Sequence, residues 1–469
     1  MKHLHLLYTF LFGVAVFLFF GLAYPHHLHY QEQYQLFLFD STYVWEIVRQ
    51  PGGVADLLGR FCTQFFLFAW VGAFIIALLL SAVQLLTLRL INVQWLYGLS
   101  FVPSFLLWLY LLDENALMSG VWAILLTLFA AWCIVRLTSG WVRRILLIIA
   151  IPILYILVGP VCLPIPADGL WLGIHYHRYP TVFPWLLWGA ALSVWAFIAL
   201  RITPFAAKES TPLSHREGLG VGLFLLVALV MGIFVWKNAN FKAEKVMQYD
   251  FMACHQQWNR ILQTVDAEKP NNQIGVTVQN LALGMRGMLS ERLFDYHQNG
   301  LLGLLPDVKE DATSPMPTAE AFYQLGMIYV AQRTVFEAQE SILDFQKSGR
   351  CYKRLAQTNL ILGSYEVARK YLTALQKTLF YSDWANETLP LLGNEEAIAK
   401  HPEYGRLRQF VCSDDYYFSD HVTSDMLERL FFCNTENRLA FEYLKAYYML
   451  TGDRENYAKL ILHLQKLKQ

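Results

Sequence analysis

Residues 219–236, LGVGLFLLVALVMGIFVW, contain no charged side chain, whereas the next nine residues, KNANFKAEK at 237–245, contain four. A helix needs roughly 20 mostly apolar residues to cross the hydrocarbon core of a bilayer, at about 1.5 Å per residue. The apolar stretch therefore predicts a membrane-spanning helix. The rise in charge density after Trp236 predicts a domain boundary, with a transmembrane domain over 1–236 and a second domain over 237–469.

Six further apolar runs precede this helix. Pro103 lies in the third run and Pro152 in the fifth, and prolines are tolerated in spans whose freed carbonyls find other partners. The span count is therefore open around these two runs. No small-x-small cleavage site follows the first run, which favours a retained span over a signal peptide. The predicted spans are Leu6–Tyr24, Thr63–Leu88, Trp95–Leu112, Met118–Leu137, Ile145–Leu163, Phe183–Ile202 and Leu219–Trp236.

The composition of the whole chain agrees with a membrane protein. Of its 469 residues, 55% are hydrophobic and 16% are charged, whereas soluble domains have about 25% charged residues. The 15% aromatic content excludes a disordered chain. The 37 basic and 37 acidic side chains leave no net charge, so binding to nucleic acid through bulk charge is not expected. The composition therefore predicts that the chain interacts with the lipid bilayer.

Basic residues in the short loops set the predicted orientation, because cytoplasmic loops are enriched in Lys and Arg. The loop between spans four and five holds Arg136, Arg143 and Arg144, and the loop between spans six and seven holds Arg201, Lys208 and Arg216. This distribution places the N-terminus in the cytoplasm. Seven crossings then place residues 237–469 outside the cytoplasm.

The first external loop contains an amphipathic segment at 43–61. Pro51-Gly52-Gly53 divides it into two short helical stretches, each with apolar side chains on one side. Such a broken helix is expected to lie in the membrane interface or to lead back into span two.

The second domain has the pattern of paired helices. Apolar residues recur at helical spacing, and short turns with glycine or polar residues separate the members of each pair. The predicted pairs are Ala321–Gln332 with Thr334–Lys347, Arg350–Leu362 with Tyr365–Thr378, and Arg438–Leu450 with Arg454–Leu467. The predicted fold class is therefore all-α, with about seven transmembrane helices followed by a soluble helical domain.

The sequence NLILGSYEVARKYLTAL at 359–375 resembles a tetratricopeptide repeat. Gly363 and Ala368 match the small residues, and Tyr365 and Tyr371 the aromatics, at which that repeat packs one helix against the next. The other pairs lack several of these residues and show no strict 34-residue period. The resemblance implies a tetratricopeptide-like stack that binds a protein or peptide. An irregular helical bundle without a groove is the alternative.

Longer stretches are similar to a group of uncharacterised multi-span inner-membrane proteins of Bacteroidota. They are FEAQESILDFQKSGRCYKRLAQTNLILGSYEVARKYLTALQKTLFYSDWA at 336–385, YQEQYQLFLFD at 30–40 and PGGVADLLGRF at 51–61. This resemblance implies an inner (cytoplasmic) membrane location in a Gram-negative cell and a periplasmic C-terminal domain. It implies no activity.

Cysteine and histidine residues do not form a metal-site pattern. Cys254, Cys351, Cys412 and Cys433 lie in the second domain, where an oxidising compartment allows disulfides, and three pairings are possible. The clusters at 26–29 and 175–177 offer imidazoles for a metal or an anion, but aromatic neighbours favour interfacial histidines. No metal or cofactor is predicted.

One enzymatic alternative follows from the layout of the external loops. It is similar to that of membrane glycosyltransferases that use polyprenyl-phosphate sugars, in which an acid of the first external loop acts as the base. Glu32 or Asp40 would then be the base, and the lipid phosphate would be held by Arg60, His175, His177 or Arg178.

The sequence contains no GxxxxGK[ST], GxGxxG, HExxH or GxSxG motif. Gln64 and Gln84 are the main polar residues within the spans, so an ion-coupled carrier is not expected. The predicted function is therefore a membrane-anchored protein-interaction scaffold.

Overall fold

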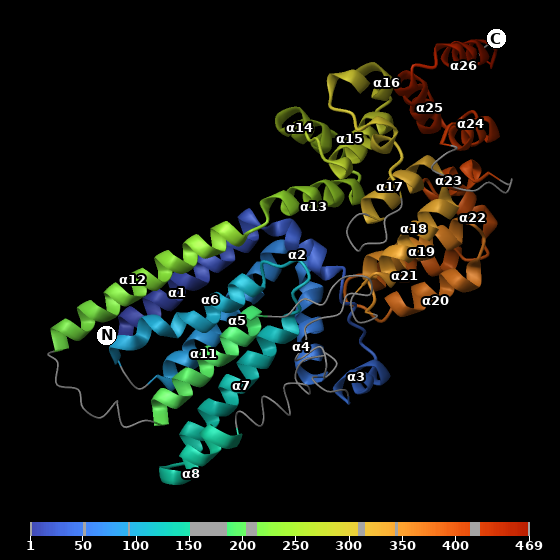
Figure 1. The fold of residues 1–469 in the computed structure, drawn as a ribbon. Coiled ribbons are helices and arrows are strands. Elements are labelled where there is room, and N and C mark those ends of the chain that lie inside the picture. Colours follow the sequence, from blue (N-terminus) through green and yellow to red (C-terminus); the bar gives the residue numbers. More distant parts are fainter. Residues whose placement is uncertain are drawn as a thin grey trace. The chain divides into compact units, whose positions relative to one another are not determined.

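The computed structural model describes residues 2–49, 53–91, 94–150, 185–202, 213–307, 315–342, 346–412 and 423–467, and each regular element in these ranges is a helix. The fold class is all-α, as predicted. The chain divides into two compact units, Met1–Glu244 (unit 1) and Lys245–Gln469 (unit 2). Figure 1 colours the chain from blue to red along the sequence.

Unit 1 contains four helices that are long and apolar enough to cross a membrane, among the residues that the structure describes. Predicted spans three and six are shorter apolar helices, at Leu96–Tyr110 and Trp185–Leu200. Most of the predicted fifth span lies outside the described residues. The four long segments are His5–Ala23, Ala69–Leu90, Met118–Leu137 and Gly218–Asn238.

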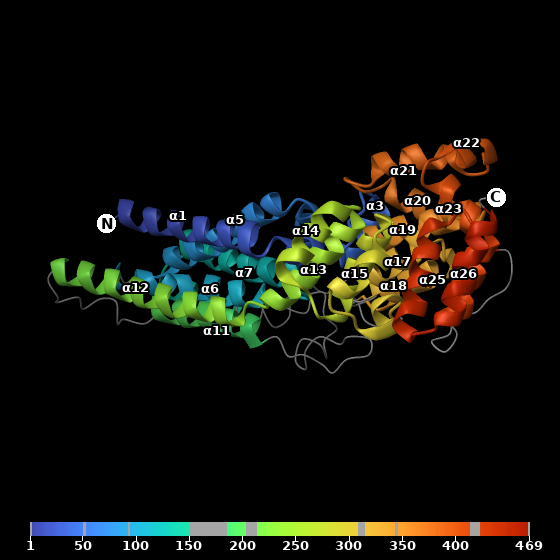
Figure 2. The same ribbon diagram turned by 90° about the horizontal axis from the view of Figure 1, so that it is seen from above.

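The helices of the four long segments and the two shorter ones run alongside one another in both views (Figures 1 and 2). The first long segment consists of an α-helix that continues as one π-helical stretch. The helices are α1 (Lys2–Leu18) with η1 (Phe19–Ala23), α5 (Ala69–Leu90), α6 (Val102–Tyr110), α7 (Met118–Leu137), α11 (Trp185–Ile202) and α12 (Leu213–Asn238).

Polar contacts join α1 and α5 to the helical turn η3 (Gln94–Phe101). The Gln84 side chain accepts a hydrogen bond from the Thr9 hydroxyl at 2.8 Å and donates one to the Ser100 hydroxyl at 2.9 Å. Interhelical hydrogen bonds of this kind, together with small residues at the contact, hold helices together in lipid. Gln84 is therefore satisfied inside the helix packing, and these contacts give it a structural role.

Three short helices occupy the first predicted external loop. The predicted amphipathic segment is found as α3 (Ser41–Val48) and α4 (Gly53–Thr63), on either side of the predicted break. A further helix, α2 (Pro25–Glu32), was not predicted. Gly59 of α4 packs so tightly on α7 that a Cβ there would lie 2.7 Å from the backbone nitrogen of Ser119.

Unit 2 consists of helices that form consecutive pairs. Two of the predicted pairs are confirmed, namely α19 (Gly349–Ile361) with α20 (Tyr365–Leu375), and α25 (Arg438–Thr451) with α26 (Arg454–Leu467). The predicted break at Arg333 is wrong. The turn lies at Gly326, whose φ of +91° only glycine adopts readily, between α17 (Pro315–Leu325) and α18 (Ile328–Glu340).

A large hydrophobic core joins helices of unit 2, with Phe322, Leu360 and Tyr443 among its fully buried members, and a second, smaller cluster lies among α17, α18 and α19. Asn437 shows how local and distant contacts combine: its side chain caps α25 at the backbone N–H of Ala440 and donates to the carbonyl of Leu325. The remaining helices are α13 (Phe241–Cys254, which begins in unit 1), α14 (Trp258–Glu268), α15 (Gln273–Met285), α16 (Leu289–Arg292), α21 (Ser382–Thr388), α22 (Glu395–Lys400), α23 (Tyr404–Phe410) and α24 (Thr423–Cys433).

Candidate functional site

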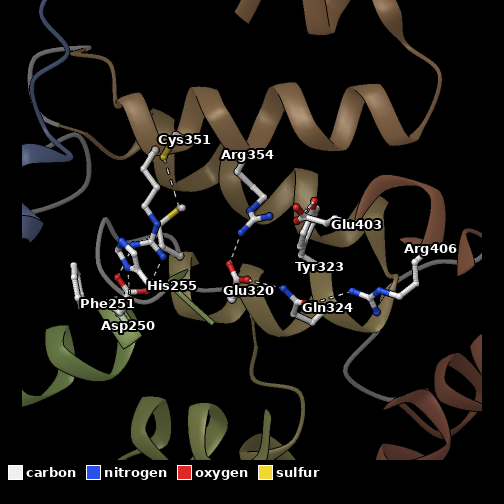
Figure 3. Close-up of polar contacts among 12 residues, drawn as sticks. Asp250, Phe251, His255, Glu320, Tyr323, Gln324, Cys351, Arg354, Glu403 and Arg406 are labelled. Carbon is white, nitrogen blue, oxygen red and sulfur yellow. Dashed lines mark hydrogen bonds and ion pairs between the residues drawn. The ribbon is translucent and has the colours of Figure 1, made fainter. Parts of the chain in front are cut away.

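A connected set of charged and polar side chains lies between the helices of unit 2. Figure 3 shows a close-up of this set and labels all of its members except Arg350. We call them the buried network: Asp250, Glu320, Tyr323, Gln324, Arg350, Arg354, Glu403 and Arg406.

One end of the buried network joins α13 to α19. The Arg350 guanidinium donates to both carboxylate oxygens of Asp250, at 2.5 and 2.8 Å. Both side chains are 12% exposed. A two-point contact between a guanidinium and a carboxylate is among the stronger and more directional ion pairs in proteins. This pair therefore fixes α19 against α13.

The centre of the buried network joins α19 to α17. Arg354 donates to Glu320 at 2.5 Å, and Gln324 donates to the same carboxylate at 3.0 Å. The Arg354 guanidinium also lies 3.7 Å from the centre of the Tyr323 ring. Because the Glu320 side chain is 2% exposed, its charge depends on these partners for solvation.

Residues at and before α23 complete the buried network. The Tyr323 hydroxyl donates to Glu403 at 2.8 Å, and Arg406 donates to the Gln324 side-chain oxygen at 3.3 Å. Tyr323 and Gln324 of α17 are thus bound by residues at or directly before α23.

The pKa shifts in and beside the buried network indicate a structural role. Burial alone would lower the pKa of the Arg354 guanidinium, but the neighbouring acidic groups, of which Glu320 has the largest effect, together outweigh burial and raise that pKa above its ordinary value. Burial also raises the pKa of Tyr323 well above its usual range, so its hydroxyl stays a donor. Burial raises the pKa of Cys254 as well, which keeps this thiol unreactive. The buried network therefore fastens helices together and offers no activated nucleophile.

The outer side of α18 is different in character. Tyr329 and Phe336 are 59% and 52% exposed, and Arg333 between them is also exposed. Residues spaced by four and three positions along a helix lie on the same face. We call these three residues the α18 aromatic face. It is the candidate interaction site of unit 2.

The structure describes three of the six residues predicted as the site of the glycosyltransferase alternative, namely Glu32, Asp40 and Arg60. Asp40 is the N-cap of α3, where its carboxylate accepts from the backbone N–H groups of Thr42 and Tyr43 at 3.0 and 3.1 Å. Glu32 is the last residue of α2 and is buried. His175, His177 and Arg178 lie outside the described residues.

Arg60 is held by its neighbours on α3 and α4. It pairs with Asp56 at 2.6 Å and donates to the Tyr43 hydroxyl at 3.4 Å. That hydroxyl in turn donates to the carbonyl of Leu36 at 2.7 Å. Tyr43 therefore connects Asp40 and Arg60, and both contacts serve to position α3 and α4.

A carboxylate that the sequence analysis missed fastens the start of α2. Glu244 accepts hydrogen bonds from the backbone N–H groups of His26 and His27, both at 2.8 Å. These N–H groups lack partners within the helix, and the helix dipole favours a negative charge there. Burial raises the pKa of Glu244 to about 7, although both N–H donors oppose the shift.

His27, whose backbone N–H binds Glu244, has a structural role. His27 is fully buried, and its Nε2 atom lies 2.9 Å from the carbonyl oxygen of Leu111. Burial lowers the pKa of His27 to about 3, so this ring is neutral at physiological pH. Nothing in the local sequence indicates this arrangement, because Glu244 is 218 residues from His26.

The described cysteines are free thiols: Cys62, Cys133, Cys254, Cys351, Cys412 and Cys433. Within the same part of the chain, no group of three or more His, Cys, Asp or Glu side chains is arranged to hold a metal ion.

A family model described as a family of unknown function, DUF6057, matches residues 1–469, so the chain belongs to that family. No curated protein and no solved structure matches the chain significantly.

Proposed function

We propose that this member of the DUF6057 family is a membrane-anchored interaction scaffold. In this proposal unit 1 spans the inner membrane of a Bacteroidota cell several times, with the N-terminus in the cytoplasm. Unit 2 is a tetratricopeptide-like helical domain that presents a binding surface to the periplasm. The four long apolar helices of unit 1 and the consecutive helix pairs of unit 2 support this organisation.

The α18 aromatic face is the observation that carries the proposal. Single exposed apolar side chains are common on protein surfaces. Tyr329 and Phe336, however, lie on one face of one helix with Arg333 between them. Tyr and Arg are enriched among the residues that dominate binding energy in protein interfaces. The helix surfaces of α17 and α19 that face the buried network are already occupied by the chain itself, whereas the α18 aromatic face is exposed.

Site-specific photo-crosslinking in cells tests this surface on the full-length protein. A photoreactive amino acid at position 336 is expected to give a discrete adduct with a second protein. Tyr329→Ala in the same chain should reduce that adduct strongly, because the two aromatic rings share one face. Position 369 on α20 is the control, since Arg369 is half-exposed and lies outside the α18 aromatic face.

The same adducts at positions 336 and 369, or no adduct at position 336, would count against the scaffold proposal. An adduct at 336 that Tyr329→Ala leaves unchanged would place the contact on a different surface.

The glycosyltransferase alternative now depends mainly on Glu32. The Asp40 carboxylate is used as a helix cap and Arg60 is paired with Asp56. Glu32→Gln tests this alternative through the glycan and lipid-linked sugar profiles of cells that produce equal amounts of the protein. Unchanged profiles would remove it, and loss of one product would favour it over the scaffold.

A further inference from the structure

A groove of about 460 Å³ runs along unit 1 between α5 and α7. Its walls are formed mainly by apolar side chains, including Leu85 and Leu86 from α5 and Leu125 and Leu126 from α7. Arg89 and Trp132 are part of the same lining. The groove therefore combines a long apolar surface with one basic side chain.

The two helices run in the same direction, as their contacts with α2 show. Near the start of α5, a Cβ at Gly72 would lie 3.2 Å from Leu28 of α2. Near the start of α7, Gln31 of α2 donates to the carbonyl of Ala116 at 3.3 Å. Both helices thus begin beside α2 and end away from it, so Arg89 and Arg136, which lie in their last turns, belong to the same end of unit 1.

The length of the groove matches one leaflet of a membrane. On α7 its lining extends from Trp122 to Trp132, which is about 15 Å along a helix. The hydrocarbon core of a bilayer is about 30 Å thick, so this distance is about half of it. Trp132 lies at the basic end, and tryptophan is enriched at the level of the lipid headgroups.

The charge at this end favours an anionic group. Arg89 is exposed and has no ion pair within the described ranges, and neither α5 nor α7 contains an acidic residue. Arg136 is also exposed, and its guanidinium lies 5.7 Å from the Trp132 ring. Basic side chains between membrane helices near the surface attract the phosphates of anionic lipids.

We propose that this groove binds one anionic phospholipid. An acyl chain lies along the four leucines, and the phosphate is bound by Arg89 with Arg136 beside it. A peptide segment would need partners for its backbone N–H and C=O groups, and the mostly apolar lining offers few. An acyl chain has no such groups.

Native mass spectrometry of the full-length protein in detergent, titrated with phosphatidylglycerol or phosphatidylcholine, tests the site. The wild type should retain one phosphatidylglycerol molecule in preference to phosphatidylcholine. Arg89→Gln should weaken this binding about fivefold, the effect expected for one basic side chain near the membrane surface. Arg144→Gln is the matched control, because Arg144 is an exposed arginine that does not line the groove.

A second variant, Leu126→Trp, fills the groove and keeps both arginines, so it should also lose the bound lipid. Melting temperatures without added lipid show whether Leu126→Trp folds. If it does not fold, the comparison of Arg89→Gln with Arg144→Gln decides whether the lipid binds in the groove. The proposal is overturned if the wild type does not prefer phosphatidylglycerol, or if Arg89→Gln and Arg144→Gln bind it equally. Unchanged binding by a folded Leu126→Trp protein would also overturn it, because the acyl chain would then lie elsewhere.

Discussion

At the scale of single residues, Glu244 makes the stability of unit 1 depend on pH. Its folded-state pKa is about 7, above the ordinary value of 4.5, because burial penalises the charged form. The folded protein therefore binds a proton more tightly than the unfolded chain does. This contribution to stability is complete below pH 4.5 and is lost as the pH rises through about 7, by about 3 kcal/mol in all.

Glu244→Gln cannot ionise and should lack this component. Melting curves of the purified full-length protein between pH 4.5 and 8 measure it as the difference between wild type and variant. Glu366→Gln, an exposed acid on α20, should follow the wild-type curve. Parallel curves for the wild type and Glu244→Gln would show that the carboxylate does not titrate in this range.

The buried network predicts a large effect from a small substitution. Glu320→Gln removes the negative charge beside Arg354 and leaves a buried guanidinium without a counter-charge, which costs about 3–5 kcal/mol. The exposed pair of Glu396 and Lys400 provides the control, since Glu396→Gln should change stability by less than about 1 kcal/mol. Chemical denaturation of the full-length protein compares the two. Equal effects would mean that the buried network contributes no more than a surface pair.

Individual side-chain contacts were the feature of the structure that the sequence predicted least well. The sequence marks Asp40 and Arg60 as charged residues of an external loop, but it does not show that one caps α3 and the other pairs with Asp56. Glu244 was missed because its partners are backbone N–H groups of α2, and backbone donors leave no signature in the sequence. The same applies to the Asp250–Arg350 pair, whose members are 100 residues apart.

At the scale of helices, the crossing of α4 and α7 depends on Gly59. A Cβ at this position would lie 2.7 Å from the Ser119 nitrogen and 3.1 Å from its Cα, and neither backbone atom can move alone. Gly59→Ala should therefore lower stability by about 1–3 kcal/mol. Gly222→Ala on α12 meets no atom within 4 Å and should be neutral or slightly stabilising. Thermal melting in detergent distinguishes the two, and equal melting temperatures would show that the crossing is loose.

Helices with strong periodicity and clear end signals were predicted well. The bounds of α7 were predicted as Met118–Leu137, and α19, α20, α25 and α26 were predicted within a few residues. The turn between α17 and α18 was misplaced at Arg333, whereas it is made by Gly326, which lies inside the predicted helix Ala321–Gln332 and has a positive φ. Helix α2 was missed because its buried face includes histidine, glutamine and glutamate, which do not form an apolar stripe.

At the scale of the whole molecule, the number of membrane crossings determines the compartment of unit 2. In the proposed topology, seven crossings from a cytoplasmic N-terminus would place residues 237–469 in the periplasm. Alkaline phosphatase fused after Gln469 should then be active and green fluorescent protein at the same site dark. The opposite pattern would indicate an even number of crossings and would move the binding surface into the cytoplasm. Fusions after Leu90 and Leu137 are expected to report the cytoplasm and calibrate both reporters.

The buried network also limits how this protein can be shortened. Repeat proteins usually tolerate trimming, because each repeat touches only its neighbours. Here the counter-charge of Arg350 comes from α13 and the acceptor for Tyr323 comes from the segment before α23. A minimal fragment covering α17–α20 alone would expose the Arg350 guanidinium and the Tyr323 phenol to water, whereas the intact chain buries both. A soluble fragment of unit 2 should therefore begin upstream of Asp250 and extend beyond Arg406.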